Sequence, residues 1–376
     1  MADLQPSPQH HFTFGLPTSR DLTQLPIEPW DFVHGLAEIG AWGVAIHDDE
    51  LVPPTARPQE RESLLGKFRA ALDNTGIVVS LVATDLSRHP AFTDGAFTSA
   101  SRYVRRCAIQ KALRALDLGM ELGAPIHVFS GAHEGAAASA TRALTDPLDR
   151  YREAINFLCG YARDQGYPVT FALVPDASGP RGDALLPTIG QVLVFIETLD
   201  HPDMVGLSAR PTLEPMVGQG EYSGVTHAIW SGRLARIDLN AAQIGSQLGF
   251  GSAGLKDAFL LVKILEESDY VGPRHFGACP HRGEYARGIW DFATGCMRTY
   301  LALTAKVRRF GDDPDIQEAL ADAGALDLAE PTVGPYNREL AQKLASETFD
   351  PDTLAAAEYH HERLDQLITD LLLGLR

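Results

Sequence analysis

The sequence predicts an α/β protein, a (β/α)8 TIM barrel followed by a C-terminal helical arm. Short β-branched or aromatic runs alternate with helical stretches, and eight such units fit into roughly 300 residues. Several of the runs are apolar on both faces, as expected for strands of a parallel sheet that helices cover. The last 67 residues carry helical patterns but no strand-like run. A doubly wound sheet is the alternative, and it is less favoured because no GxGxxG turn follows the first run.

The eight apolar runs are the expected strands of the barrel. Each is short, rich in β-branched or aromatic residues, and separated from the next run by a turn and a helical stretch. In chain order they cover residues 12–16, 42–46, 77–83, 126–130, 169–174, 204–208, 234–239 and 273–277.

Helices are expected between these runs. Residues 101–122 are rich in Ala, Leu, Arg and Lys, and residues 146–165 open with an Asp-Pro pair suited to a helix start. The stretches 191–199 and 255–267 repeat apolar residues at helical spacing. In the arm, helices are expected over 315–323, 337–346 and 352–373.

The chain is expected to divide into a barrel over 1–309 and an acidic arm over 310–376. The arm has fifteen acidic against four basic residues, a net charge of −11. Its last helix has an apolar face, so the arm must pack on something. Two interpretations stay open: packing on its own barrel, or embracing a neighbouring subunit. The residues of this face are Leu364, Leu367, Ile368, Leu371 and Leu372.

Composition excludes several classes of protein. The 376 residues carry a net charge of −17, which argues against binding nucleic acid or anionic lipid. No apolar run is long enough to span a membrane, and the N-terminus does not resemble a secretory signal. The cysteines lack the spacing of a zinc site and are typical of reduced thiols, so we expect a cytoplasmic protein. They are Cys107, Cys159, Cys279 and Cys296.

Eight short motifs are spread over nearly the whole chain. They are FTFGL at 12–16, IHDDELVP at 46–53, DGAFT at 94–98, GPRGDALLPT at 179–188, IDLN at 237–240, GPRHF at 272–276, GCMR at 295–298 and HERLDQL at 361–367. Together they resemble the xylose isomerase family, in its compact actinobacterial type. The resemblance implies a TIM barrel with a C-terminal helical arm, usually a homotetramer, in carbohydrate metabolism. It also implies interconversion of aldose and ketose sugars with two divalent cations.

The residues that hold metal and sugar in the family are replaced after the fifth strand. The family motif there is Leu-Glu-Pro-Lys-Pro, in which Glu bridges the metals and Lys contacts the sugar. This chain has Val174 at the glutamate position and Asp176 at the lysine position. A metal ligand is therefore lost, and the charge of the sugar contact is reversed.

The remaining ligand positions follow the same pattern. The family's Glu and His after strand six correspond to Arg210 and Leu213, and the final aspartate of its strand eight corresponds to Gly277. The loop after strand seven is shorter and lacks the family's Asp-x-Asp pair, so Asp238 is the ligand that remains. Since one carboxylate holds Mg²⁺ weakly, we expect no metal cofactor.

Removal of two cations would leave carboxylates that repel each other. We therefore expect Arg210 to reach the former metal site and pair with Asp238 or Asp176, with Arg236 adding a second positive charge. The alternative is that Arg210 is an ordinary residue on a surface loop.

Two further features bear on catalysis. His47 and Asp48, with Glu50 beyond them, match a family histidine that assists ring opening, so they are either a retained acid/base group or a packing remnant. Cys279 and His281 could form a relocated Zn²⁺ site with residues nearby, although Cys-x-His alone is a weak signal.

The sequence thus predicts a xylose isomerase-like protein that has lost metal-dependent isomerisation and has a binding, regulatory or structural role. The alternative is an active sugar isomerase, or another carbohydrate enzyme, with a rearranged and metal-free site. The expected partners are further copies of the chain, as a dimer or tetramer through the arm, and a true isomerase with which the chain co-assembles.

Overall fold

The computed structural model describes residues 5–16, 27–86, 89–130, 134, 145–177, 184–218, 220–239, 242–243, 246–247, 249–277, 286–322, 333–352 and 361–376. The chain divides into two compact units, Met1–Ala302 and Leu303–Arg376. This division falls close to the predicted boundary at 309/310. No helix in the described ranges has the length and apolar character needed to cross a membrane.

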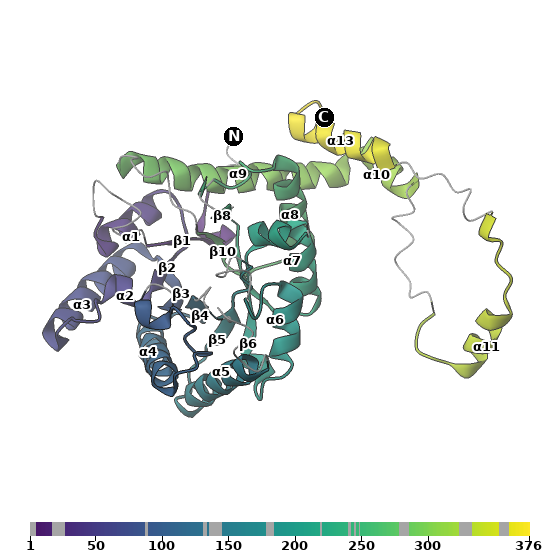
Figure 1. The fold of residues 1–376 in the computed structure, drawn as a ribbon. Helices are drawn as coiled ribbons and strands as arrows, with labels where there is room; N and C mark the ends of the chain where they lie inside the picture. Colours follow the sequence, from purple (N-terminus) through teal and green to yellow (C-terminus); the bar gives the residue numbers. More distant parts are fainter. Residues whose placement is uncertain are drawn as a thin grey trace. The chain divides into compact units, whose positions relative to one another are not determined.

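Eight parallel strands close into a barrel, which confirms the predicted fold class (Figure 1). Around the barrel the order is β1-β10-β7-β6-β5-β4-β3-β2. Each strand overlaps one of the eight predicted runs. The strands are β1 (Phe12–Gly15), β2 (Gly43–His47), β3 (Val78–Asp85), β4 (Ile126–Ser130), β5 (Thr170–Leu173), β6 (Val205–Ala209), β7 (Leu234–Asp238) and β10 (Arg274–Phe276).

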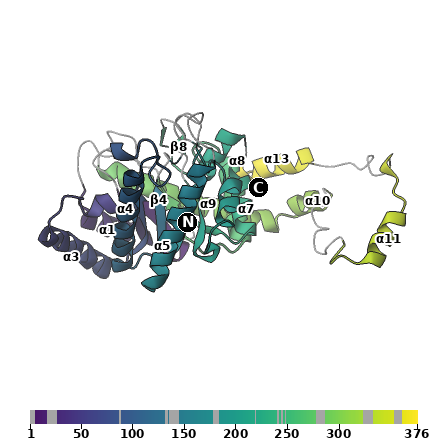
Figure 2. The ribbon, with the colours of Figure 1, turned by 60° about the horizontal axis from the view of Figure 1, so that its bottom comes forward.

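Helices surround the strands (Figures 1 and 2). The predicted helices appear as α4 (Arg102–Glu121), α5 (Asp146–Asp164), α6 (Ile189–Ile196) and α8 (Leu255–Glu267). For the others the prediction gave no residue range: α1 (Pro29–Glu38), α2 (Asp48–Leu51), α3 (Pro58–Thr75), α7 (Glu221–Trp230) and α9 (Ala286–Asp312). Short 3-10 helices are η2 (Pro8–His10), η3 (Pro90–Phe92), η6 (Pro202–Met204) and η7 (Pro211–Val217), and a small antiparallel pair is β8 (Ala242–Gln243) with β9 (Ser246–Gln247).

Local sequence explains where several helices begin and end. Thr188 and Gln191 form a capping box at the start of α6, with hydrogen bonds of 3.3 and 3.2 Å between backbone N–H groups and side-chain oxygens. Ser101 accepts a hydrogen bond from the Val104 N–H at the start of α4. Gly76 ends α3 with a φ of 73°, a left-handed conformation that glycine adopts without strain.

The sheet has an inner and an outer face because side chains alternate along each strand. Phe12 and Phe276 are on the outer face, where Phe12 packs against Tyr300 of α9 with ring centroids 5.4 Å apart. Thr13 pairs in register with His275, and His275 with Asp238, so these three side chains share the other face. Small and branched residues fill part of the barrel core, namely Ala45, Leu81, Ala83, Ile126, Val128 and Ala172.

The second unit is helical in its described residues. It contains the end of α9, then α10 (Pro314–Asp322), α11 (Arg338–Ser346) and α13 (His361–Leu373). Leu367, Ile368 and Leu371 are buried, as predicted for the apolar face of the last helix. Ion pairs of 2.8 Å between Arg363 and Glu318, and 2.6 Å between Arg376 and Asp315, tie α13 and the C-terminus to α10.

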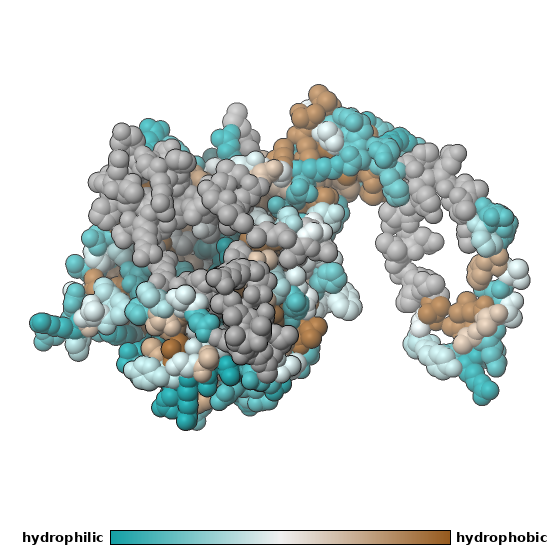
Figure 3. Space-filling model, in the orientation of Figure 1, coloured by the Kyte–Doolittle hydropathy of each residue, from teal (hydrophilic) through white to brown (hydrophobic). Residues whose placement is uncertain are grey.

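On the face that Figure 3 shows, the described residues of the barrel are mainly hydrophilic, with hydrophobic residues scattered among them. Trp230 and Val194 are among the exposed large hydrophobic residues. Single exposed apolar side chains are normal on soluble proteins and need no partner to explain them.

The contact between α1 and α9 generates a prediction about stability. A Cβ atom added at Gly35 would lie 2.2 Å from the Trp290 ring, which stacks on Phe32. We expect Gly35→Ala to lower the free energy of unfolding by about 1–3 kcal/mol, because the ring must move. Urea unfolding followed by tryptophan fluorescence measures this.

Gly66→Ala is the matched control, since Gly66 lies within α3 and a Cβ there meets nothing within 4 Å. This variant should gain about 0.5–1 kcal/mol from higher helix propensity. Equal stability changes in the two variants would contradict the packing of α1 against α9.

Candidate active site at the barrel mouth

The predicted site residues lie where parallel strands end. Asp176 follows β5, Arg210 follows β6, Asp238 is the last residue of β7, and Gly277 follows β10. Because the carboxyl ends of all the strands meet at one end of the barrel, these residues belong to its mouth.

Arg210 pairs with Asp176 across the ends of β5 and β6. The distance from Arg210 Nη1 to Asp176 Oδ2 is 3.3 Å, and the side chains are 30% and 14% exposed. The predicted pairing of Arg210 is thereby confirmed, with Asp176 as the partner. Arg210 and Asp176, at the positions where the resemblance places a glutamate and a lysine, thus form an ion pair in this chain.

Asp238 is held from two sides. Arg236 Nη2 lies 3.7 Å from its Oδ2, and the Gly277 N–H donates a 3.1 Å hydrogen bond to its Oδ1. Burial alone would raise the pKa of Asp238, but His275, Arg236, Arg210 and the Gly277 N–H together lower it below its ordinary value. Asp238 is therefore a carboxylate at neutral pH.

Gly277 is required by this arrangement. A Cβ atom built at this position would lie 2.5 Å from Asp238 Oδ2, which is closer than real Cβ contacts allow. A side chain at this position, such as the aspartate that the resemblance places here, would therefore displace the Asp238 carboxylate from its present position.

His275 lies beside the carboxylate on the inner face of β10. Its Nδ1 is 3.0 Å from Thr13 Oγ1. Burial, together with the charge of Arg236, lowers the pKa of His275 to about 3, so the ring is neutral at physiological pH.

Val174 and Leu213 are the apolar members of the predicted site. Val174 packs against the buried core of the barrel, and Leu213, within η7, is 5% exposed. Neither side chain has an oxygen or nitrogen atom that could ligate a metal.

These residues do not fit the pair of divalent cations that the family implies. Mg²⁺ and Mn²⁺ require several hard oxygen ligands, whereas here each of the two carboxylates has a guanidinium beside it. Within the described ranges, no three His, Cys, Asp or Glu side chains are grouped as metal ligands. Cys279 and His281, the alternative Zn²⁺ site, lie outside the described residues.

A second polar cluster follows β2. Lys111 of α4 lies 2.8 Å from Asp48 and also pairs with Asp49, while the Asp85 N–H donates to Asp48 at 3.1 Å. Burial raises the pKa of Asp48, and the bonds to Lys111 only partly offset this. Sequence reasoning missed Lys111, because nothing distinguishes it from other basic residues of its helix.

His47 precedes this cluster. Its backbone N–H donates to Glu50 at 3.0 Å, so this contact of Glu50 is with the His47 backbone. His47 Nδ1 is buried without a hydrogen-bond partner among the described residues. Buried side-chain nitrogens usually have a hydrogen-bond partner, so this atom is an exception among the described residues.

Glu134 connects three loops around the mouth, and no sequence signal pointed to it. Its carboxylate accepts hydrogen bonds of 3.1, 2.7 and 3.0 Å from the backbone N–H groups of residues 96, 97 and 98. Its carbonyl oxygen accepts a further bond of 3.1 Å from the Leu185 N–H. Glu134 thus holds the segments after β3, β4 and β5 together.

The closed barrel of eight parallel strands with helices around it is a (β/α)8 TIM barrel. A family model described as "Xylose isomerase-like TIM barrel" matches residues 33–210. A xylose isomerase from Thermus thermophilus is 44% identical, over 99% of both chains. The chain therefore belongs to the xylose isomerase family.

Solved structures of more distant proteins share the fold. An Escherichia coli 3-keto-D-glucoside 4-epimerase is 14% identical and superposes with a TM-score of 0.54, covering 80% of this chain and 99% of that one. A Methylomonas D-allulose 3-epimerase in complex with D-allulose is 16% identical, with a TM-score of 0.54 and coverage of 82% and 98%. At these identities the similarity supports the barrel fold alone.

The pair of Arg236 and Asp238 leads to a second prediction. Asp238→Asn removes the carboxylate that pairs with the Arg236 guanidinium, which is 8% exposed and has no other ion pair among the described residues. We expect a loss of about 3 kcal/mol in the free energy of unfolding at neutral pH. Urea unfolding of wild type and variant measures this loss.

The pH dependence of this difference in the free energy of unfolding tests whether Asp238 is ionised in the folded protein. Because the folded pKa of Asp238 lies below the ordinary 3.8, its contribution is present above that pH and is lost as the pH falls through the folded value. The difference in the free energy of unfolding between wild type and Asp238→Asn should therefore become smaller in acid. Asp176→Asn, in the more exposed pair, is the control and should cost less than Asp238→Asn. A difference that stays the same in acid would contradict the conclusion that Asp238 is ionised and paired with Arg236.

Proposed function

We propose that this member of the family does not catalyse metal-dependent aldose–ketose isomerisation, and that its mouth binds a small polar ligand in a regulatory or structural role. The observation that carries the proposal is the pair of guanidinium–carboxylate contacts, Arg210 with Asp176 and Arg236 with Asp238. They involve positions that match the family's metal and sugar ligands.

The chemistry of the two groups explains the expected loss. In the family, the divalent cations hold the open-chain sugar and polarise its carbonyl. A guanidinium keeps the positive charge and offers hydrogen-bond donors, but it has no vacant coordination position. The guanidiniums thus balance the negative charge of Asp176 and Asp238, but they do not supply the Lewis acid that polarises the sugar carbonyl in the family.

The same groups suit a polar ligand. Guanidinium N–H groups donate to hydroxyl or carboxylate oxygens, and Asp176 and Asp238 accept from hydroxyl groups. Sugars and sugar acids have both kinds of group, so we propose this ligand class.

One observation favours a second candidate, a metal-free carbohydrate enzyme. The buried Nδ1 of His47 has no hydrogen-bond partner among the described residues, and its neighbour Asp48 is bonded to Lys111. A histidine beside a paired carboxylate can transfer protons to and from a substrate hydroxyl. Under this candidate, His47→Gln would abolish turnover while leaving ligand binding in place.

We further propose a homo-oligomer, a dimer or tetramer, assembled through the arm, and co-assembly with a true isomerase. The HERLDQL motif, at the start of α13, supports the retention of the arm. A cytoplasmic location is proposed because Cys107, Cys159 and Cys296 are free thiols.

Metal content and turnover on one untagged preparation test the main proposal. We expect no bound divalent metal and no conversion of xylose to xylulose when Mg²⁺, Mn²⁺ or Co²⁺ is added, because Val174 and Leu213 cannot ligate and the carboxylates are already paired. The homologous Thermus enzyme, assayed in parallel, is the positive control.

Turnover that a chelator abolishes would overturn the proposal. It would mean that ligands outside Val174, Arg210, Leu213 and Gly277 rebuild the metal site. Turnover that persists with chelator would instead establish the metal-free candidate.

Thermal unfolding with added ligands tests the ligand class. We expect sugars or sugar acids to raise the melting temperature equally with and without Mg²⁺, and Arg210→Ala to reduce that rise. Arg308→Ala is a matched control on an exposed part of α9. A rise that depends on Mg²⁺ would count against the proposed ligand site.

A further inference from the structure

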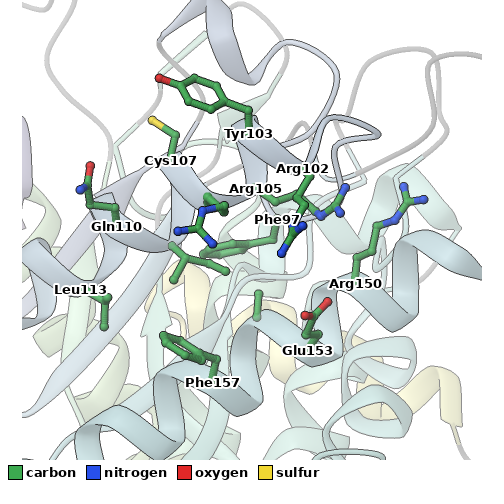
Figure 4. Close-up of a pocket in the computed structure, with 13 residues that line it drawn as sticks. Phe97, Arg102, Tyr103, Arg105, Cys107, Gln110, Leu113, Arg150, Glu153 and Phe157 are labelled. Carbon is green, nitrogen blue, oxygen red and sulfur yellow. The ribbon is translucent and has the colours of Figure 1, made fainter.

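A surface groove runs between α4 and α5, on the outer wall of the barrel (Figure 4). Its volume is about 640 Å³, and residues of the two helices line it over Phe97. A cavity of this size suits a small molecule rather than a single ion. Among the lining residues, Phe97 also contacts the mouth region, through the hydrogen bond of its backbone N–H to Glu134.

One end of the groove is strongly cationic. Four arginines line the groove: Arg102, Arg105 and Arg106 of α4, and Arg150 of α5. Among the described residues of the lining, Glu153 is the one that is acidic. Arg102, Arg105 and Arg150 lie together at this end in Figure 4. Clustered guanidiniums produce a local positive field that attracts anionic ligands, even on a chain whose net charge is −17.

Two of the arginines are held in place by the protein. Arg105 donates to the carbonyl oxygens of Ser99 and Ala100, at 2.7 and 3.2 Å. Arg150 donates to the Thr98 carbonyl oxygen at 3.3 Å and lies 3.8 Å from Asp146. Their guanidinium groups are therefore already ordered, which lowers the entropy cost of binding an anion.

The other two arginines are free to bind. Arg102 and Arg106 are exposed and make no hydrogen bond or ion pair with the described part of the chain. Each guanidinium can present two parallel N–H donors to an oxyanion.

The opposite end of the groove is apolar. Phe157 and Leu113 lie there in Figure 4, away from Arg102, Arg105 and Arg150, and Phe157 is 56% exposed. An exposed ring of that size next to a cavity favours a ligand with an apolar part.

We infer that this groove binds a free phosphate monoester with an apolar body. The arginines would hold the dianionic phosphate, and Phe157 would pack against the rest of the ligand. Several guanidiniums at one place favour a group with two charges and three acceptor oxygens over a single carboxylate. This site is independent of the function proposed for the mouth.

Titration calorimetry of the full chain with phenyl phosphate, inorganic phosphate and phenol tests the inference. Phenyl phosphate should bind most tightly, because it alone has both parts. The Arg102→Glu/Arg106→Glu variant should weaken its binding by at least about tenfold. Arg114→Glu, an exposed arginine of α4 outside the groove lining, should change it less than about twofold.

The Phe157→Ser variant tests the contribution of the apolar end of the groove separately from that of the arginines. It should weaken phenyl phosphate while leaving inorganic phosphate unchanged, a result that a general charge effect would not produce. Circular dichroism checks that each variant is folded, and Arg102→Gln/Arg106→Gln replaces the charge reversal if that variant unfolds.

Three results would overturn the inference. The first is no binding of phenyl phosphate, or equal losses in the groove and Arg114 variants. The second is a phosphotyrosine peptide that binds more than about tenfold tighter than phenyl phosphate, which would assign the groove to a phosphoprotein. The third is a change of sedimentation in the groove variants without ligand, which would make this face an interface between copies.

Discussion

The guanidinium of Arg236 is buried inside the barrel, and the arrangement of charged residues at the mouth depends on neutralising its charge. Burial lowers the pKa of Arg236, but an arginine side chain does not give up its proton at physiological pH, so the protein must supply a negative charge. Asp238 supplies it, and its own ionised state is stabilised in return. Within the described residues Arg236 Nε still has no hydrogen-bond partner, which leaves this charge incompletely satisfied.

The rest of the mouth follows from that pair. Gly277 has no side chain, so its N–H can approach Asp238, and the neutral His275 ring adds no further positive charge at physiological pH. Arg210 and Asp176 form a second pair nearer to solvent. A divalent cation added to this arrangement would meet two guanidiniums, whose repulsion it could overcome only by displacing them. The family fold is thus preserved around a mouth with a different charge arrangement.

Much of the fold and part of the site could be predicted from sequence, for reasons visible in particular residues. The apolar runs predicted all eight strands because burial on both faces leaves a local signature. No residue range was predicted for the helix α1, whose contact with Trp290 joins residues that are distant in the chain. Lys111 and Glu134 were missed because their partners, Asp48 and the 96–98 backbone, lie far away in sequence. Arg210 could be predicted because a family motif set the position at which a charge was needed.

Anomalous scattering from crystals grown with Mn²⁺ tests the central claim most directly, since it locates the metal and the guanidiniums in one experiment. The account predicts no manganese peak at the mouth, with Arg210 on Asp176 and Arg236 on Asp238. A manganese peak bound to Asp238, with Arg210 or Arg236 turned away, would contradict it and show that the family's metal centre survives.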